Sequence, residues 1–156
     1  TEGRATESGP ARPRAAALFN AVFDASAVAS MADVKAALAS RSAQVVDARP
    51  AGRFAGTDPE PRPGLSSGHM PGSVNLPFAA IIENGQLKDG AALEAAFAGA
   101  GVDLDKPVIT SCGSGVSAAI LSTAMELVGK PPKALYDGSW AEWATASGAE
   151  IVVDKP

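Results

Sequence analysis

The stretch PVITSCGSGVSAAILSTAMELV, residues 107–128, settles the fold class and contains the candidate site. Its first part, Pro107–Ser111, is a short apolar run that is typical of a buried strand in a parallel sheet. Its last part, Val116–Val128, has apolar residues at helical spacing, and Gly129 with the two prolines that follow ends the predicted helix. A strand that passes through a short loop into a helix is the repeating unit of α/β proteins.

The segments on both sides of this stretch continue the alternation of strands and helices. Helical spacing predicts helices over Ala27–Ser40 and Gly90–Gly101, and Trp140–Ala146 has room for one or two helical turns. In the first of these helices Ser30 is the expected N-cap, with Asp33 in the first turn. Further strands are predicted for the short apolar runs Gln44–Ala48, Ser73–Leu76, Ala134–Tyr136 and Ile151–Val153. This order predicts an α/β fold with a central, mainly parallel sheet that is flanked by helices on both faces.

Composition divides the chain into a polar start and one domain. Residues 1–14 are rich in Gly, Pro, Ser, Arg and Glu, and we expect a linker or tail there. With 156 residues in the chain and 46% of them hydrophobic, residues 15–156 are enough for a single domain with its own core. The chain begins with Thr and lacks the profile of a signal peptide, so we expect a piece of a longer protein.

Charge and residue counts exclude several classes of partner. The net charge is −4 and no basic patch is present, which argues against nucleic acid. No apolar run reaches the roughly 18–20 residues of a membrane span, so we expect no membrane partner. One cysteine and one histidine exclude a disulfide and a Cys- or His-rich metal site, and we expect neither metal nor cofactor. A free cysteine is compatible with a reducing compartment, and we expect a cytoplasmic protein.

The candidate nucleophile is Cys112, which follows the strand directly. Ligands of open parallel sheets bind outside the carboxyl ends of the strands. Gly113 and Gly115 let the backbone turn sharply and bring its amides inward, and the start of the helix adds positive partial charge. Such a loop favours the Cys112 thiolate and suits an anionic persulfide. The alternative is a buried structural cysteine, which is common, but its position between a strand and a Gly-rich helix start favours a reactive one.

Two other loop chemistries fit the sequence less well. A nucleotide-binding phosphate loop ends on Lys followed by Ser or Thr, and this loop has no Lys. A cysteine-dependent phosphatase needs an Arg six positions after the cysteine to hold the phosphate, and Ala118 stands there.

From about Ala15 onwards the sequence resembles the rhodanese superfamily, in particular the C-terminal, active half of its tandem sulfurtransferases. The motifs that carry the resemblance are the cysteine loop, DAR (47–49), GHMPGSVNLP (68–77) and YDGSWAEW (136–143). The resemblance implies a rhodanese-like fold and a catalytic Cys112 that carries sulfur as a persulfide. It also implies a partner, an N-terminal rhodanese-like domain of the same full-length protein.

The residues after the cysteine indicate the sulfur donor within this family. Members that prefer 3-mercaptopyruvate tend to have Gly-Ser there, whereas members that prefer thiosulfate tend to have Arg-Lys, and this chain has Gly113-Ser114. The long Pro/Gly-rich segment after the DAR motif also resembles the mercaptopyruvate group, in which the arginines matching Arg53 and Arg62 hold the carboxylate and keto oxygen. The resemblance implies transfer of sulfur from 3-mercaptopyruvate to a thiol or cyanide acceptor.

The site that the resemblance implies has catalytic and substrate-binding members. Cys112 and Ser114 are expected to be catalytic, and the residues expected to bind the substrate are Arg53, Arg62, Gly113, Gly115, Val116 and Ser117. Ser117 stands where the family usually has Thr. His69 is interpreted as structural.

Two alternatives for the function remain open. The first is a thiosulfate sulfurtransferase, which differs only in the donor. The second is a persulfide-carrying or regulatory module that is weakly active alone. The family's serine matching Ser114 is proposed to work with a His and an Asp of the N-terminal half, which this chain does not contain.

Overall fold

A parallel sheet forms the centre of the molecule. The computed structural model describes residues 3, 5–6, 8–10, 13 and 15–154, and within them five strands pair in the order β1-β7-β6-β2-β3, all parallel. The strands are β1 (Val28–Ala29), β2 (Gln44–Asp47), β3 (Val74–Asn75), β6 (Val108–Ser111) and β7 (Ala134–Tyr136). Asp47 and Ser111 are register partners at the ends of β2 and β6. The segments that leave these two strands therefore start side by side at one edge of the sheet.

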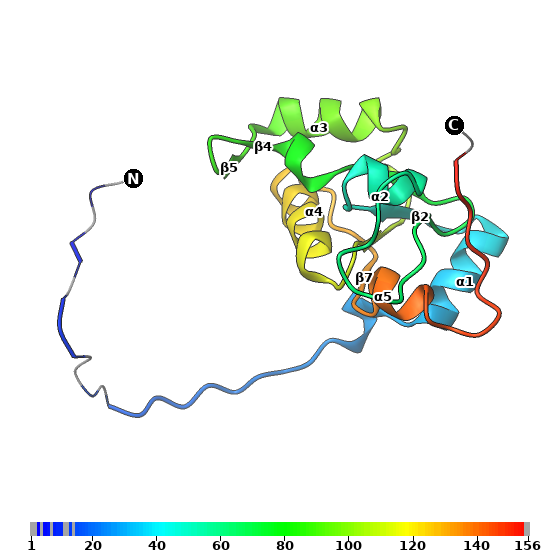
Figure 1. Cartoon of the computed structure of the whole chain (residues 1–156). Coiled ribbons are helices and arrows are strands. Elements are labelled where there is room, and N and C mark those ends of the chain that lie inside the picture. The colour runs from blue at the N-terminus through cyan, green and yellow to red at the C-terminus, as the bar shows by residue number, and fades with distance from the viewer. Residues whose placement is uncertain (1–2, 4, 7, 11–12, 14, 155–156) are drawn as a thin grey trace.

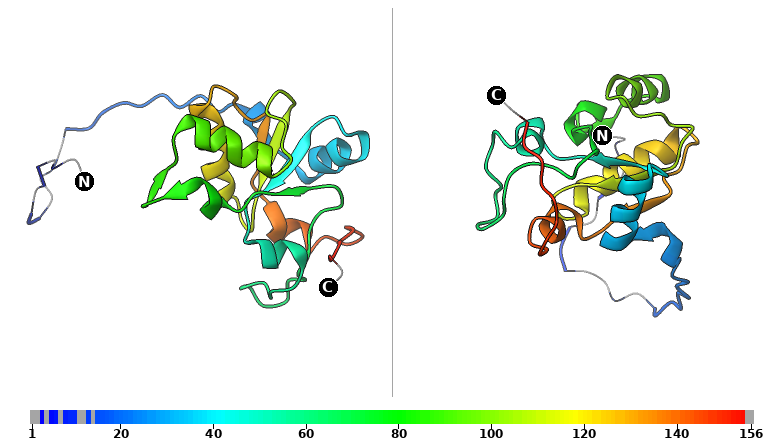
Figure 2. Two further views of the ribbon diagram at one scale, coloured as in Figure 1. Left: turned by 90° about the horizontal axis from the view of Figure 1, so that it is seen from above. Right: turned by 90° about the vertical axis from the view of Figure 1, so that its right-hand side faces the viewer.

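Helices cover both faces of this sheet (Figures 1 and 2). Helices α1 (Met31–Ser40) and α5 (Ser139–Trp143) lie on one face, and α3 (Gly90–Gly99) and α4 (Val116–Leu127) on the other. Successive side chains of a strand point to opposite faces, so Val45 packs with the first pair of helices and Val46 with the second. The predicted α/β fold with a parallel sheet between two helix layers is confirmed.

The segment between β2 and β3 contains a helix that the sequence analysis missed. Helix α2 (Ala51–Ala55) begins after Pro50, whose carbonyl accepts the amides of Arg53 and Phe54. It ends at Gly56, where φ is +86°. The remaining elements are η1 (Ala25–Ala27), η2 (Phe78–Ile81) and the hairpin of β4 (Ile82–Glu83) and β5 (Gln86–Leu87).

The predicted N-cap of the first helix is confirmed, and one predicted strand differs in the structure. Within the predicted range Ala27–Ser40 the helix begins at Met31, because Ser30 and Asp33 form a capping box in which each side chain accepts the other's backbone amide. The strand predicted over Ile151–Val153 is wrong as a member of the sheet. Val152 instead forms an isolated antiparallel bridge with His69, so this segment fastens the GHMPG turn.

Residues 15–24 extend away from the domain (Figure 1). Of the predicted linker, residues 1–2, 4, 7, 11–12 and 14 lie outside the described residues. Residues 15–24 form neither helix nor strand and are exposed. The boundary at residue 15 stays a prediction. No helix in the described part of the chain combines the length and apolar character needed to cross a membrane.

Candidate active site

A pocket of about 270 Å³ lies at the carboxyl end of β6 and brings most of the predicted site together. Six of the eight predicted residues line it: Cys112, Gly113, Ser114, Ser117, Arg53 and Arg62. Glu60, Pro61 and Leu65 complete the wall. The long segment after β2 therefore folds over the cysteine loop and supplies both arginines, as expected for a loop with a functional role.

Cys112 lies at the base of this pocket and is buried, with 1% of its surface exposed. Burial by itself raises the pKa of its thiol. The Ser117 hydroxyl and the backbone amides of Ser114, Ala118 and Ser117 act in the opposite direction and together lower the pKa below its ordinary value. The Ser114 amide donates to Sγ at 3.4 Å. The loop thus provides the amide-lined environment that the sequence predicted for a thiolate.

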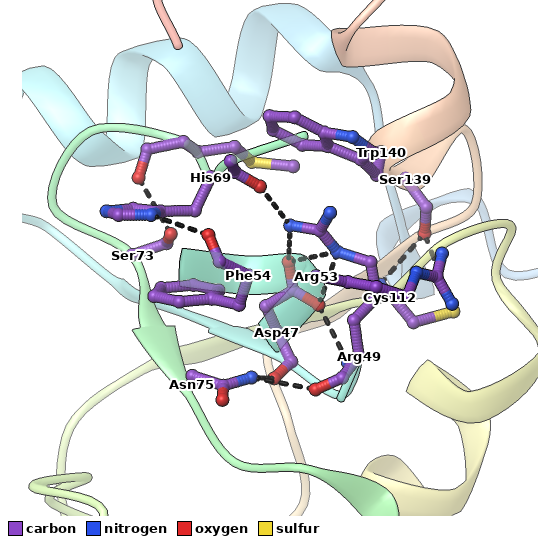
Figure 3. A network of polar contacts seen from close by, with 12 residues as sticks. Asp47, Arg49, Arg53, Phe54, His69, Ser73, Asn75, Cys112, Ser139 and Trp140 are labelled. Atoms are coloured by element: carbon purple, nitrogen blue, oxygen red, sulfur yellow. Dashed lines mark hydrogen bonds and ion pairs between the residues drawn. The ribbon is translucent and has the colours of Figure 1, made fainter. Parts of the chain in front are cut away.

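The cysteine loop is anchored by Ser139, a residue to which the sequence analysis gave no role. Its buried Oγ accepts the amides of Cys112 and Gly115, each at 3.1 Å, and donates to the Tyr136 carbonyl at 2.7 Å (Figure 3). Its φ is +52°, a conformation that costs a non-glycine residue about 1–3 kcal/mol. The only signal in the sequence was its place in the motif YDGSWAEW.

Gly115 and Val116 do not line the pocket, although both were predicted to bind the substrate. Gly115 has a φ of +83°, and a Cβ there would come within 2.6 Å of the Asp137 carboxylate, so the loop requires glycine at this position. Its amide bonds Ser139. The side chain of Val116 is on the surface, where the residue is 76% exposed. Substrate binding by these two residues stays a prediction without a supporting contact.

A buried ion pair lies at the carboxyl end of β2 (Figure 3). The Arg49 guanidinium donates to the Asp47 carboxylate through Nε at 2.9 Å and Nη2 at 2.7 Å, and both side chains are 1% exposed. Nη2 also donates to the Gly68 carbonyl, and the guanidinium lies 4.2 Å from the Trp140 ring centroid. These contacts give Asp47 and Trp140 structural roles.

The ion pair extends toward the pocket through Glu60. Arg49 Nη1 donates to Glu60 Oε1 at 2.9 Å, and Arg53 donates to the same carboxylate through Nε and Nη2. The side chain of Glu60 is 2% exposed and that of Arg53 is 22% exposed. Arg62 is exposed, and among the described residues no side-chain hydrogen bond or ion pair involves it. The two arginines of the pocket therefore differ, because only the charge of Arg53 is compensated.

His69 has the contacts of a structural residue. Its Nδ1 lies 2.9 Å from the carbonyl oxygen of Phe54, and its ring stacks on the Phe54 ring at a centroid distance of 4.1 Å. Its backbone pairs with Val152. It ties α2 to the C-terminal segment and does not line the pocket.

The structure has the architecture that the sequence motifs predicted. A parallel sheet lies between two helix layers, and a buried cysteine lies in an amide-lined loop at the start of α4. The family model described as "Rhodanese-like domain" matches residues 30–146, and the chain belongs to this family.

Curated relatives are sulfurtransferases. The chain is 48% identical over 133 residues to 3-mercaptopyruvate sulfurtransferase of Escherichia coli (strain K12), a match that covers 85% of this chain and 47% of the relative. It is 44% identical over 144 residues to thiosulfate sulfurtransferase of Bos taurus, with 91% and 48% covered. The crystal structure of SseA from Escherichia coli, described as a 3-mercaptopyruvate sulfotransferase, superposes with a TM-score of 0.67 at 44% identity, over 79% of this chain and 45% of that one. The chain thus spans about half the length of the relatives it matches.

Proposed function

We propose that the protein is a sulfurtransferase that moves sulfane sulfur from 3-mercaptopyruvate, through a persulfide on Cys112, to a thiol or cyanide acceptor. The observation that carries the proposal is the pocket in which a low-pKa cysteine faces two arginines. Arginine forms bidentate hydrogen bonds to planar oxyanions, which suits the carboxylate and keto oxygen of an α-keto acid.

In the first half-reaction the Cys112 thiolate attacks the donor's sulfur. A sulfur–sulfur bond forms and the donor's carbon–sulfur bond breaks. The electron pair of the broken bond moves into the carbonyl as the enolate of pyruvate, which then takes up a proton to give pyruvate. Arg53 and Arg62, which hold the carboxylate and keto oxygen, stabilise the charge that develops on that oxygen.

In the second half-reaction the acceptor attacks the outer sulfur of the persulfide. The sulfur–sulfur bond breaks and Cys112 leaves as a thiolate. The contacts that lower its pKa, from Ser117 and the amides of Ser114 and Ala118, make it a better leaving group. The same loop therefore serves both half-reactions, as nucleophile environment and as leaving-group environment.

Ser114 is proposed as a second catalytic residue. It is exposed at the rim of the pocket, where its hydroxyl can meet groups from outside this domain. We place those groups in an N-terminal rhodanese-like domain of the same protein, with residues 15–156 as the catalytic domain and 1–14 as its linker. The half-length coverage of the relatives supports this arrangement. A low-pKa thiol persists in a reducing compartment, so the proposal includes a cytoplasmic location.

The test is intact-protein mass spectrometry after incubation with 3-mercaptopyruvate. One added sulfur atom on the wild-type chain, none on the Cys112→Ser variant, and its loss on adding cyanide are the expected results. Sulfur uptake by the Cys112→Ser variant would contradict the assignment. Uptake only from thiosulfate would favour the alternative, a thiosulfate sulfurtransferase, to which the bovine relative corresponds in name. If this chain takes up sulfur but only the full-length protein turns over, the second alternative is favoured, a persulfide-carrying module that is weakly active alone.

A further inference from the structure

Glu60 is a buried carboxylate in the pocket wall that the mechanism above does not use. A buried charge is costly unless it is paired, and Glu60 is paired twice. It bonds Arg49 on the side of the sheet and Arg53 on the side of the pocket. It is therefore the link between the buried ion pair and the group proposed to hold the substrate.

The contacts of Glu60 fix the orientation of Arg53. Arg53 donates through Nε to Oε1 at 3.1 Å and through Nη2 to Oε2, so one edge of the guanidinium is held against the carboxylate. A guanidinium has five N–H donors. The two on Nη1 and the second one on Nη2 are left for a ligand in the pocket.

Gly113 leaves room for Arg53 beside the cysteine loop. A Cβ at Gly113 would lie 3.0 Å from Arg53 Nη2, closer than nearly all real contacts of this kind. The guanidinium thus rests against the backbone of the cysteine loop, beside Cys112 (Figure 3). Glu60 therefore holds the guanidinium in a space that is open because residue 113 has no side chain.

Glu60 also affects the net charge of the pocket. Asp47, Arg49, Glu60 and Arg53 alternate in sign along one chain of contacts and sum to zero. Among the charged residues that line the pocket, Arg62 alone is then uncompensated. Apart from the Cys112 thiolate itself, the pocket then has one uncompensated positive charge, which matches a donor with one carboxylate better than a dianion.

We propose that Glu60 is a specificity-determining positioning residue, which aims the free N–H groups of Arg53 at an α-keto acid and keeps the pocket's positive charge too low to favour a dianion such as thiosulfate. The choice of donor rests on the proposed function, whereas the effect on pocket charge does not.

The pocket charge is tested by alkylation of Cys112 with two small reagents of similar shape. Iodoacetate is an anion and iodoacetamide is neutral, so the rate with iodoacetate divided by the rate with iodoacetamide reports the charge near Cys112. A change in the thiol pKa affects both rates equally and cancels in this ratio. In Glu60→Gln the ratio should rise about five- to tenfold, as expected for one added unit of charge in the pocket wall in a medium between protein and water. Glu126→Gln, an exposed change of the same charge on α4, should leave the ratio unchanged. An unchanged ratio in Glu60→Gln overturns the proposal.

Orientation is tested in the full-length protein with both donors. Glu60→Gln should shift the ratio of kcat/KM for thiosulfate over 3-mercaptopyruvate upward, by a factor similar to that of the alkylation ratio. Glu60→Asp keeps the charge but shortens the side chain. It should raise KM for 3-mercaptopyruvate and leave the alkylation ratio at its wild-type value. An unchanged KM in Glu60→Asp overturns the positioning role.

The two variants also separate the possible failures. Should Glu60→Gln not fold, Glu60→Asp still tests the positioning role, and its iodoacetamide rate checks that the pocket is intact. A shifted alkylation ratio in a protein that transfers sulfur from neither donor supports the charge role and refutes the proposed function. If Glu60→Gln transfers sulfur from 3-mercaptopyruvate and neither the alkylation ratio nor the kcat/KM ratio shifts, the role of Glu60 is refuted and the proposed function is not.

Discussion

The Oγ atom of Ser139 accepts the backbone amide of Cys112 at 3.1 Å, although the two residues are 27 positions apart in the chain. The same oxygen accepts the amide of Gly115, at the other end of the cysteine loop. The first residue of α5 therefore holds both ends of the loop that begins α4. The shape of the candidate site therefore depends on this hydroxyl as well as on the loop's own glycines.

Ser139→Ala should destabilise the fold, because it leaves two buried amides without an acceptor. We expect a loss of about 2–4 kcal/mol in the free energy of unfolding, measured by urea titration. Ser139→Gly removes the same bonds but adopts a positive φ easily, so it should lose about 1–2 kcal/mol less than the alanine variant. Ser147→Ala, at an exposed position, is the control. Equal stability of Ser139→Ala and Ser147→Ala would contradict the anchoring role.

The Cys112 thiol should titrate below the free-thiol value of about 8.5. The pH dependence of iodoacetamide alkylation measures this pKa, and Ser117→Ala should raise it, because the Ser117 hydroxyl lowers it in the wild type. A pKa depressed in the folded state stabilises the fold above the unfolded value of about 8.5, and this contribution disappears as the pH falls through the folded-state pKa. A pKa at or above that of the unfolded chain would remove the basis of the mechanism.

In the full-length protein kcat/KM should be higher for 3-mercaptopyruvate than for thiosulfate. Gly113 and Ser114 add no charge beside the sulfur, and Arg53 is already paired with Glu60. Replacing Gly113-Ser114 by Arg-Lys should move the preference toward thiosulfate through its two added charges. It should also lower kcat/KM for 3-mercaptopyruvate, because a side chain at residue 113 would contact Arg53. Steady-state kinetics with both donors gives the two kcat/KM values. A higher value for thiosulfate in the wild type would identify the protein as a thiosulfate sulfurtransferase.

Arg53→Ala and Arg62→Ala should each lower kcat/KM for 3-mercaptopyruvate about ten- to hundredfold, as expected for loss of charged hydrogen bonds worth roughly 1.5–3 kcal/mol. The loss should be smaller with a donor that lacks a carboxylate, because Cys112 and its amides are unchanged. Full activity of either variant would show that its arginine does not hold the substrate.

The same two variants should differ in stability. Arg62 is exposed, and its removal should change the free energy of unfolding by less than about 0.5 kcal/mol. Arg53→Ala leaves the buried Glu60 with Arg49 as its one cationic partner and should cost about 1–3 kcal/mol. Thermal or urea unfolding of both variants gives this comparison. Equal stability of the two variants would contradict a stabilising role of the Arg53–Glu60 ion pair.

The sheet and the large helices could be predicted because their local pattern agrees with their environment. The run before Cys112 is wholly apolar or small because β6 is buried on both faces, and α4 has the spacing of a helix with one buried side. Of the predicted site residues that line the pocket, Arg53 and Arg62 were located through the family resemblance, whereas Cys112 and the loop residues after it follow the end of a strand. Such positions can be located from sequence, since parallel strands direct their carboxyl ends to one edge.

The rest depends on contacts that no local pattern encodes. Helix α2 is little more than one turn, AGRFA, with a glycine inside and Pro/Gly-rich sequence after it, so its periodicity is too short to detect. Glu60 reaches Arg49 across 11 positions of an irregular segment. The positive φ of Ser139 accompanies side-chain bonds to Cys112 and Gly115, which lie 27 and 24 positions away and which no local pattern encodes.

The near-complete burial of Cys112 also bears on how the protein survives oxidants. A low-pKa thiolate is the species that peroxides convert to sulfenic and higher acids. With 1% of its surface exposed, Cys112 can be reached only by molecules small enough to enter the pocket that the two arginines line. Bulky oxidants are thereby kept from the thiolate, whereas small ones such as hydrogen peroxide can still enter. In the proposed function, in which Cys112 is re-formed at every turnover, the size of the pocket therefore limits which oxidants compete with the sulfur donor.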